Sequence, residues 1–315
     1  MNPEINTSRV STMAALVSVG AVSFLALGAV FLLVKDTGTQ VATVIEAATS
    51  TPARSSPFDT LPLEARAAYV VDLVTGEVLL SRNAELQLPL ASLTKLMSAL
   101  IVSAALADTD TISITATSLE ADGDSGLRVG ERFTMRDLLS LALISSSNDA
   151  TVALGEAALA KSGSAGTLSD LMNTKARNLH LVQTYFVNET GLDPSPSVSG
   201  AYGSAKDVAS LLSFLITNHA DLLEPTTKAQ VMVLGYDATV AVTHTAKNTN
   251  VALPNIPGLI ASKTGFTDLA GGNLAIGFDV GLAHPLVAVV LGSSEEGRFT
   301  DMLKIVSTAN EHFSK

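Results

Sequence analysis

Residues 90–107 read LASLTKLMSALIVSAALA and place a serine and a lysine three positions apart at the start of an apolar run. If Ser92 begins a helix that continues to about residue 107, Lys95 lies one turn further on, where its amine can reach the hydroxyl. Burial of this helix would lower the pKa of the lysine, and a neutral amine can act as a general base. The buried arc comprises Leu93, Leu96, Met97, Leu100 and Ile101. Taken alone, the pattern also fits a helix cap followed by a solvated lysine.

A second motif, ISSSNDA at residues 144–150, lies between two expected helices. Short polar residues often cap helix starts, so capping alone is one explanation of this stretch. The functional alternative gives Ser146 a hydroxyl that relays a proton. It gives Asn148 an amide that holds both a lysine and a substrate peptide bond.

A third motif, KTGFTDLAGG at residues 263–272, precedes an expected strand. On an edge strand, Lys263 and Thr264 would offer a cation and a hydroxyl donor to a carboxylate. The small Gly265 would let a substrate backbone lie alongside. The alternative is a turn at a strand end with an exposed lysine.

The hydrophobic pattern around these motifs predicts an α/β fold with one sheet built from both ends of the folded region. Residues 67–73 and 77–81 are expected to form a hairpin, and residues 121–131 a loop. Ser204 and Asp207 form a capping-box pattern at the start of one helix. Further helices are expected at 135–143, 148–160, 168–179, 205–218 and 296–313, and strands at 272–280 and 285–292.

The three motifs occur in the order Ser-x-x-Lys, Ser-x-Asn and Lys-Thr-Gly, which is typical of penicillin-binding proteins and class A β-lactamases. Longer stretches resemble the D-alanyl-D-alanine carboxypeptidase family of serine peptidases. They are AYVVDLVTG at 68–76, LASLTKLM at 90–97, FVNETGL at 186–192 and KTGFTD at 263–268. The resemblance covers about residues 63–315. It implies a fold of the β-lactamase and transpeptidase type, with an antiparallel sheet flanked by helices and a mostly helical subdomain.

The resemblance implies acyl transfer on peptidoglycan stem peptides that end in D-Ala-D-Ala, with β-lactams as inhibitors and no metal or cofactor. Ser92 would attack the carbonyl between the two D-alanines, Lys95 would take its proton, and Ser146 would pass a proton to the leaving D-alanine. Water would then release the shortened peptide. Whether the enzyme cuts a terminal D-alanine or a cross-link stays open, as does the third residue of the stem peptide.

Five further residues are implied to bind the substrate. Asn148 would orient Lys95 and the substrate, while Lys263 and Thr264 would bind the terminal carboxylate. Gly265 would border the substrate. The backbone amides of Ser92 and Phe266 would form the oxyanion hole.

Two alternatives to a D,D-peptidase stay open. One rests on a departure from the family's sequence pattern, and the other on loss of catalytic activity. Glu189 stands where the family usually has proline, and ETGLD at 189–193 superficially resembles a class A β-lactamase loop whose glutamate activates the deacylating water. A β-lactamase that depends on Glu189 is therefore one alternative, although a simple loop substitution also explains this residue. A catalytically inactive cell-wall-binding protein is the other, and the complete set of motif residues argues against it.

The N-terminal region predicts a tethered enzyme. Residues 13–34 form a run of 22 residues without a charge between Arg9 and Lys35, long enough to span a membrane as a helix. The expected organisation is a short segment at 1–12, a transmembrane anchor at 13–34, a flexible linker at 35–62 and a D,D-peptidase domain at 63–315. Cleavage of the N-terminal segment stays open. The substrate places the catalytic domain on the extracytoplasmic side of the cell membrane.

Composition excludes other classes of protein. Lys and Arg total 19 against 30 Asp and Glu, for a net charge of −11, which argues against a nucleic-acid partner. The chain has no cysteine, which excludes disulfides, thiolate metal sites and a cysteine nucleophile. No two of the five histidines have the spacing of a helical zinc site.

Overall fold

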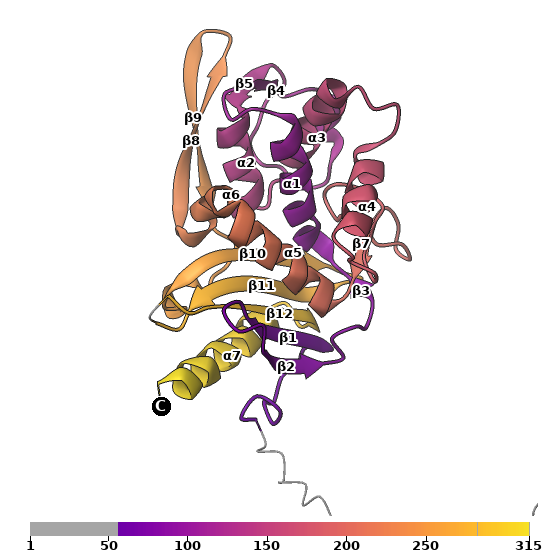
Figure 1. Ribbon diagram of the computed structural model, residues 1–315. Coiled ribbons are helices and arrows are strands. Elements are labelled where there is room, and N and C mark those ends of the chain that lie inside the picture. The colour runs from indigo at the N-terminus through magenta and orange to yellow at the C-terminus, as the bar shows by residue number, and fades with distance from the viewer. Residues whose placement is uncertain (1–55, 282, 315) are drawn as a thin grey trace, which may run out of the picture. The chain divides into compact units, whose positions relative to one another are not determined.

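The computed structural model of the chain describes residues 56–281 and 283–314 (Figure 1). They belong to one unit, Arg54–Lys315. The expected anchor at 13–34 and residues 35–55 of the expected linker lie outside the described residues. Within the described ranges, no helix is both long enough and apolar enough to cross a membrane.

The central sheet has five antiparallel strands in the order β10-β11-β12-β1-β2. The strands are β1 (Ala67–Asp72), β2 (Val78–Arg82), β10 (Leu259–Thr267), β11 (Gly271–Asp279) and β12 (Pro285–Ser293). The expected hairpin is confirmed as β1 and β2, and Asp72 Oδ1 accepts hydrogen bonds from the turn amides of Val74 and Thr75 at 2.7 and 3.2 Å. The sheet therefore joins the two ends of the unit, as the sequence predicted.

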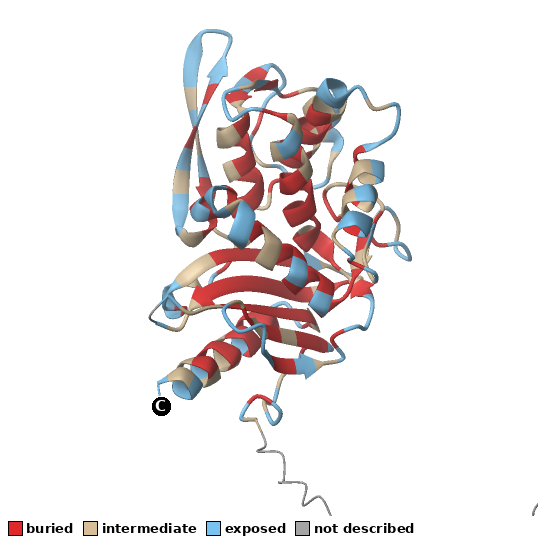
Figure 2. Ribbon diagram, in the orientation of Figure 1, coloured by how far each residue is buried: buried red, intermediate tan, exposed pale blue. Residues whose placement is uncertain are grey.

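Helices cover both faces of this sheet, which explains why β12 is apolar at nearly every position. Its side chains alternate between two cores. Leu286, Ala288 and Val290 pack in the cluster that contains Met302 of α7 (Gly297–Phe313). The other side chains of β12, Val287, Val289 and Leu291, belong to the cluster under α5 (Ala205–Asn218) and the remaining helices. Figure 2 shows the buried strands between the two layers.

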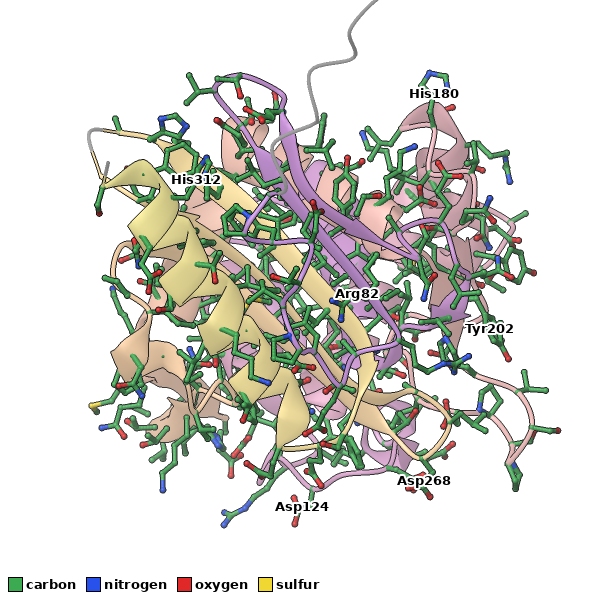
Figure 3. The ribbon with its side chains drawn as sticks, turned by 90° about the horizontal axis from the view of Figure 1, so that it is seen from below. Arg82, Asp124, His180, Tyr202, Asp268 and His312 are labelled. Carbon is green, nitrogen blue, oxygen red and sulfur yellow. The ribbon has the colours of Figure 1, made fainter. Side chains whose placement is uncertain are left out.

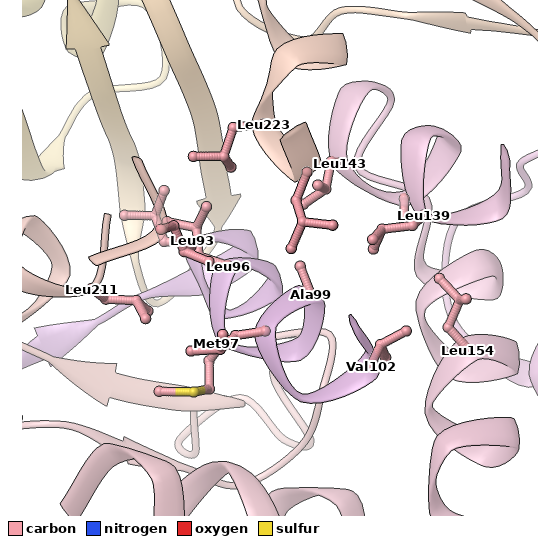
Figure 4. Close-up of a cluster of buried hydrophobic side chains, with 14 of the residues drawn as sticks. Leu93, Leu96, Met97, Ala99, Val102, Leu139, Leu143, Leu154, Leu211 and Leu223 are labelled. Atoms are coloured by element: carbon pink, nitrogen blue, oxygen red, sulfur yellow. The ribbon is translucent and has the colours of Figure 1, made fainter. Parts of the chain in front are cut away.

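The helical part surrounds α1 (Lys95–Ala105), which packs against α2 (Met135–Ile144), α3 (Asn148–Ser162), α4 (Leu168–Asn178) and α5. Each of these helices confirms one expected from the sequence. Side chains of α1 such as Leu96 and Met97 lie in the middle of the cluster in Figure 4. One detail differs, because a 3-10 turn, η1 (Ala91–Thr94), precedes α1 and carries Ser92.

Two small sheets were not predicted from the sequence. One has the order β3-β7-β6 and the other the order β4-β5-β8-β9. Their strands are β3 (Leu88–Pro89), β4 (Thr111–Ser113), β5 (Glu131–Thr134), β6 (Tyr185–Phe186), β7 (Ala201–Gly203), β8 (Gln230–Asp237) and β9 (Val240–Lys247). Short segments complete the unit: η2 (Thr117–Glu120), α6 (Ala220–Leu223), η3 (Glu224–Thr227) and η4 (Leu253–Asn255). The β8–β9 hairpin projects from the helical part in Figure 1.

The capping-box prediction is half right. Ser204 Oγ accepts the amide of Asp207 at 3.1 Å, so this serine caps α5. The Asp207 carboxylate does not return to Ser204, because it accepts from the Gln183 amide and the Thr184 hydroxyl at 2.7 and 2.9 Å. A complete capping box instead begins α4, between the residues Thr167 and Asp170.

The packed chain begins before residue 63, where the sequence placed the domain boundary. Phe58 is 0% exposed and lies in the cluster beneath α7. Its ring centroid is 5.9 Å from that of His312, and Arg82 donates to the carbonyl of Leu61 at 2.5 Å. Figure 3 shows Arg82 and His312 on the α7 side of the sheet. Residues 56–62 thus cover part of this core.

Replacing Phe58 with alanine should destabilise the protein by about 3 kcal/mol, because the change leaves a cavity in a close-packed core. Denaturant unfolding of the two proteins measures the difference in the free energy of unfolding. Val182→Ala is the control, because Val182 is 81% exposed. Equal stability of Phe58→Ala and wild type would show that residues 56–62 do not belong to the folded unit.

Candidate active site

Ser92 lies on a strained turn that is held from two sides. Ala91 beside it has φ +48°, a left-handed conformation that costs a residue with a Cβ atom some energy. Asn273 on β11 donates to the carbonyl of Leu90 at 3.1 Å. On another side, Gly191 approaches so closely that a Cβ there would lie 2.0 Å from the Ala91 oxygen. The neighbouring segments therefore fix the strained turn and, with it, the hydroxyl of Ser92.

Lys95 is 1% exposed, and its amine has three polar neighbours. Nζ lies 3.0 Å from Ser92 Oγ, 2.6 Å from Asn148 Oδ1 and 2.9 Å from the carbonyl oxygen of Thr190. The amide and carbonyl oxygens can only accept, so they bind two of the hydrogens of the amine. In a neutral amine, the lone pair is then left facing the hydroxyl of Ser92. This is the geometry that a general base needs.

The second motif divides between capping and the site. Ser147 Oγ accepts the amide of Ala150 at 3.1 Å, so Ser147 is the N-cap of α3. Ser146 and Asn148 do not serve as that cap. Ser146 has φ +60°, and its hydroxyl accepts from Lys263 Nζ at 2.9 Å. Capping therefore explains one residue of this motif and leaves the other two to the site.

The third motif lies on β10, which is an edge strand of the central sheet, as expected. Lys263 is 1% exposed, and its amine also donates to the carbonyl of Thr264 at 2.9 Å. Gly265 serves the close packing of this strand on the serine turn, because a Cβ there would lie 2.8 Å from the Leu90 oxygen. Phe266, the next residue, is exposed. The structure thus brings together the eight residues expected from the sequence, where β10 packs on η1 and where the turn before α3 contacts Lys263.

Burial lowers the pKa of both lysines, because neither charged form keeps its hydration. For Lys95 the pKa falls well below its usual value, chiefly through burial and then through the positive charge of Lys263, while Glu189 opposes the change. For Lys263, burial and then the charge of Arg298 lower the pKa to about 7. A base at Lys95 and a proton carrier at Lys263 are therefore both available near neutral pH.

Sequence reasoning missed Arg298, the second residue of α7. It is largely buried and donates to the carbonyl of Gly265 at 2.9 Å. Its guanidinium lies 4.6 Å from the ring centroid of Phe299 and 5.7 Å from that of Phe266. Arg298 reaches Gly265 only through the packing of α7 against β11 and β12, so no local sequence motif indicates it. Among the described residues, no group of three His, Asp or Glu side chains could hold a metal ion.

Comparison with known proteins agrees with this geometry. Residues 51–295 match the family model described as D-alanyl-D-alanine carboxypeptidase. The chain belongs to this family. A member from Bacillus subtilis, D-alanyl-D-alanine carboxypeptidase DacF, is 30% identical over 258 residues, which cover 78% of this chain and 62% of that protein. A D-alanyl-D-alanine endopeptidase from Pseudomonas aeruginosa is 34% identical over 240 residues, 72% of each protein.

Solved structures show the same fold. Penicillin-binding protein D2 of Listeria monocytogenes, solved with ampicillin bound, is 31% identical with a TM-score of 0.67, and the match covers 79% of this chain and 98% of that one. A D-alanyl-D-alanine carboxypeptidase of Mycobacterium tuberculosis, 24% identical with a TM-score of 0.70, matches over 82% of this chain and 94% of that one. The predicted family and fold class are therefore confirmed. The chain spans less than two thirds of the length of the Bacillus relative.

Replacing Lys263 with methionine should make the protein more stable at pH 7 and change how stability depends on pH. In the unfolded chain this lysine stays protonated to about pH 10, whereas in the folded protein its pKa is about 7. Between these values the unfolded state binds more protons, so stability rises with pH, by about 1.4 kcal/mol per pH unit for one such group. The Lys263→Met variant should lack this contribution.

Urea unfolding from pH 7 to pH 10 measures this slope for the wild type, Lys263→Met and Lys247→Met. Lys247 is an exposed residue of β9 and should leave the slope unchanged. A Lys263→Met variant with the wild-type slope would contradict the lowered pKa.

Replacing Glu189 with glutamine should lower the pKa of Lys95 further, because the negative charge of Glu189 favours the protonated amine. The neutral base is then present at lower pH. The acidic limb of the pH profile for acylation by a penicillin should move to lower pH. Glu77→Gln, an exposed change in the turn between β1 and β2, is the control. A limb that stays in place or moves to higher pH would rule out this influence of Glu189.

Proposed function

We propose that the chain is a serine-type D-alanyl-D-alanine carboxypeptidase or endopeptidase that trims peptidoglycan stem peptides through an acyl-enzyme on Ser92. The observation that carries the proposal is the contact between Ser92 Oγ and the buried amine of Lys95 at 3.0 Å. A hydroxyl next to a neutral base is an activated nucleophile. The names of the relatives, which include both carboxypeptidases and an endopeptidase, support the substrate class.

In the acylation step, Ser92 Oγ attacks the carbonyl carbon between the two D-alanines, and its proton passes to Lys95 Nζ. The backbone amides of Ser92 and Phe266 stabilise the negative charge on the carbonyl oxygen. The carbon–nitrogen bond then breaks. The leaving nitrogen takes a proton from the hydroxyl of Ser146, which regains one from the Lys263 amine at 2.9 Å. The products of this step are an ester on Ser92 and a free D-alanine or amino-terminal peptide.

In the deacylation step, water attacks the ester carbonyl. The Lys95 amine first gives up the proton it took from Ser92, which replaces the one that Lys263 lost in the acylation step. It then accepts a proton from this water and passes it to Ser92 Oγ. The ester bond breaks, Ser92 recovers its hydrogen, and the shortened peptide leaves. Asn148 Oδ1 holds Lys95 in place at 2.6 Å throughout.

Positive charge around β10 supports binding of a substrate with a terminal carboxylate. Lys263 and Thr264 offer a cation and a hydroxyl, and Arg298 adds a second cation beside the same strand. Asp124 and Asp268 lie on exposed loops, at the lower edge of Figure 3. An anionic substrate end therefore meets cations at the bottom of the site.

The same site should bind β-lactams, as the ampicillin complex of the Listeria relative suggests. Since the substrate is part of the cell wall, we place the catalytic unit on the extracytoplasmic side. The apolar run at residues 13–34 supports anchoring in the cell membrane by a single N-terminal span.

A penicillin should form one long-lived covalent adduct with the wild type and none with Ser92→Ala. Intact-mass spectrometry of the whole chain over time measures the adduct, and release of D-alanine from a D-Ala-D-Ala peptide measures turnover. Ser92→Ala should lose turnover by at least about a thousandfold, because the nucleophile is gone.

The control is Ser103→Ala, a partly buried serine on α1 outside the site, which should keep both adduct and turnover. Rapid consumption of penicillin without a lasting adduct would instead identify a β-lactamase. Neither adduct nor consumption in the wild type would favour a catalytically inactive binding protein.

A further inference from the structure

A threonine outside the three motifs lies between two of them. Thr249 follows β9, and its amide donates to the carbonyl of Ile144, the last residue of α2, at 3.1 Å. Ile144 stands two positions before Ser146. The backbone of Thr249 is therefore attached to the loop that carries the proposed proton relay.

The neighbours of Thr249 fix the turn on which it lies. The Asn248 side chain donates to the carbonyls of Thr226 and Lys228 at 2.8 and 2.9 Å and accepts the amide of Asn250 at 2.8 Å. Thr226 in turn accepts the amide of Ser262 on β10 at 3.1 Å. The turn is thus held to β10 by a chain of hydrogen bonds that does not involve the hydroxyl of Thr249.

That hydroxyl instead lies 2.5 Å from the hydroxyl of Thr264. Each hydroxyl has one hydrogen, so only one of the two can donate within the pair, and the other hydrogen must point elsewhere. Thr264 is almost fully buried, whereas Thr249 is half-buried. One hydrogen of the pair is therefore free to donate to a group that binds beside Thr264 and Lys263.

We propose that Thr249 is a substrate-binding residue that donates a hydrogen bond to the terminal carboxylate of the acyl donor, as the partner of Thr264. In the free protein one of the two hydroxyls donates to the other. When a carboxylate binds, both can turn, so that each donates to one of its two oxygens. Lys263 supplies the opposite charge. This inference rests on the proposed function, because it assigns a further contact to the same substrate. The recognised group is a free carboxylate on the leaving side of the scissile bond.

Two thioester substrates test the contact. Both carry the same acyl-D-alanyl group, one with a leaving thiol that ends in a carboxylate and the other with the methyl ester of that thiol. Thioesters are reactive enough for both to be turned over without a carboxylate contact. Thr249→Val should lower kcat/KM for the carboxylate substrate by about tenfold or more, as expected for a lost hydrogen bond to a charged group. The methyl ester should be hydrolysed at the wild-type rate.

Two further variants serve as controls. Thr249→Ser keeps a hydroxyl and should retain the preference of the wild type for the carboxylate substrate. Thr245→Val removes an exposed hydroxyl from β9 and should change neither substrate. Thermal unfolding of each variant shows whether it is folded, and Thr249→Ala replaces Thr249→Val if the valine variant is not.

The possible results separate this inference from the proposed function. If Thr249→Val lowers kcat/KM equally for both substrates, or for neither, the carboxylate contact is overturned. Turnover of the substrates by the wild type would still support the proposed function. A wild type that hydrolyses neither substrate would overturn both. A loss confined to the carboxylate substrate, with rescue by Thr249→Ser, supports the assignment.

Discussion

The site depends on the burial of two lysines whose hydrogen-bond partners are neutral. Moving an ammonium group out of water is costly unless a carboxylate compensates it. Lys95 is hydrogen-bonded to an amide, a carbonyl and a hydroxyl, and Lys263 to a hydroxyl and a carbonyl. These partners satisfy the hydrogens of the amines without restoring the stability of the positive charge. The neutral form of Lys95 is therefore favoured, which is the form that the Ser92 hydroxyl needs beside it. The pKa of Lys263 is about 7, so this lysine can both carry a charge and give up a proton near neutral pH.

Keeping two amines buried in this way requires a rigid frame. The central sheet is covered on both faces, so β10 cannot move away from α1 without exposing one of the two cores. This frame also holds Ala91 and Ser146 in left-handed conformations, at φ +48° and +60°. Such residues cost of order 1–3 kcal/mol each and persist only where the surroundings determine them. Stability gained in the cores thus offsets strain at the two serine-bearing turns.

Sequence patterns predicted the elements that short stretches of the chain determine by themselves. The apolar arc that begins at Leu93 was enough to predict α1, and the alternating residues around the turn at 74–76 were enough to predict the first hairpin. The β8–β9 hairpin was missed because burial alternates along its strands but hydrophobicity does not. Met232 and Leu234 are apolar and exposed, whereas His244 lies on the covered face, so no clear hydrophobic period results. Arg298 and Thr249 were missed for another reason. They reach the site only through the packing of α7 and of the turn after β9, which no spacing along the chain reveals.

The three basic side chains near β10 influence one another in turn. Arg298 lowers the pKa of Lys263, and Lys263 lowers that of Lys95. A bound carboxylate would cancel much of the charge of Lys263 and so weaken its effect on Lys95. If the charge of Lys263 were the main cause of the lowered pKa of Lys95, substrate binding would raise that pKa and protonate the base just before the reaction. Burial is the larger cause at Lys95, and a substrate that fills the cleft excludes further water. The amine therefore stays a base when the carboxylate is bound, and the neighbouring cations can serve mainly to attract and hold the substrate.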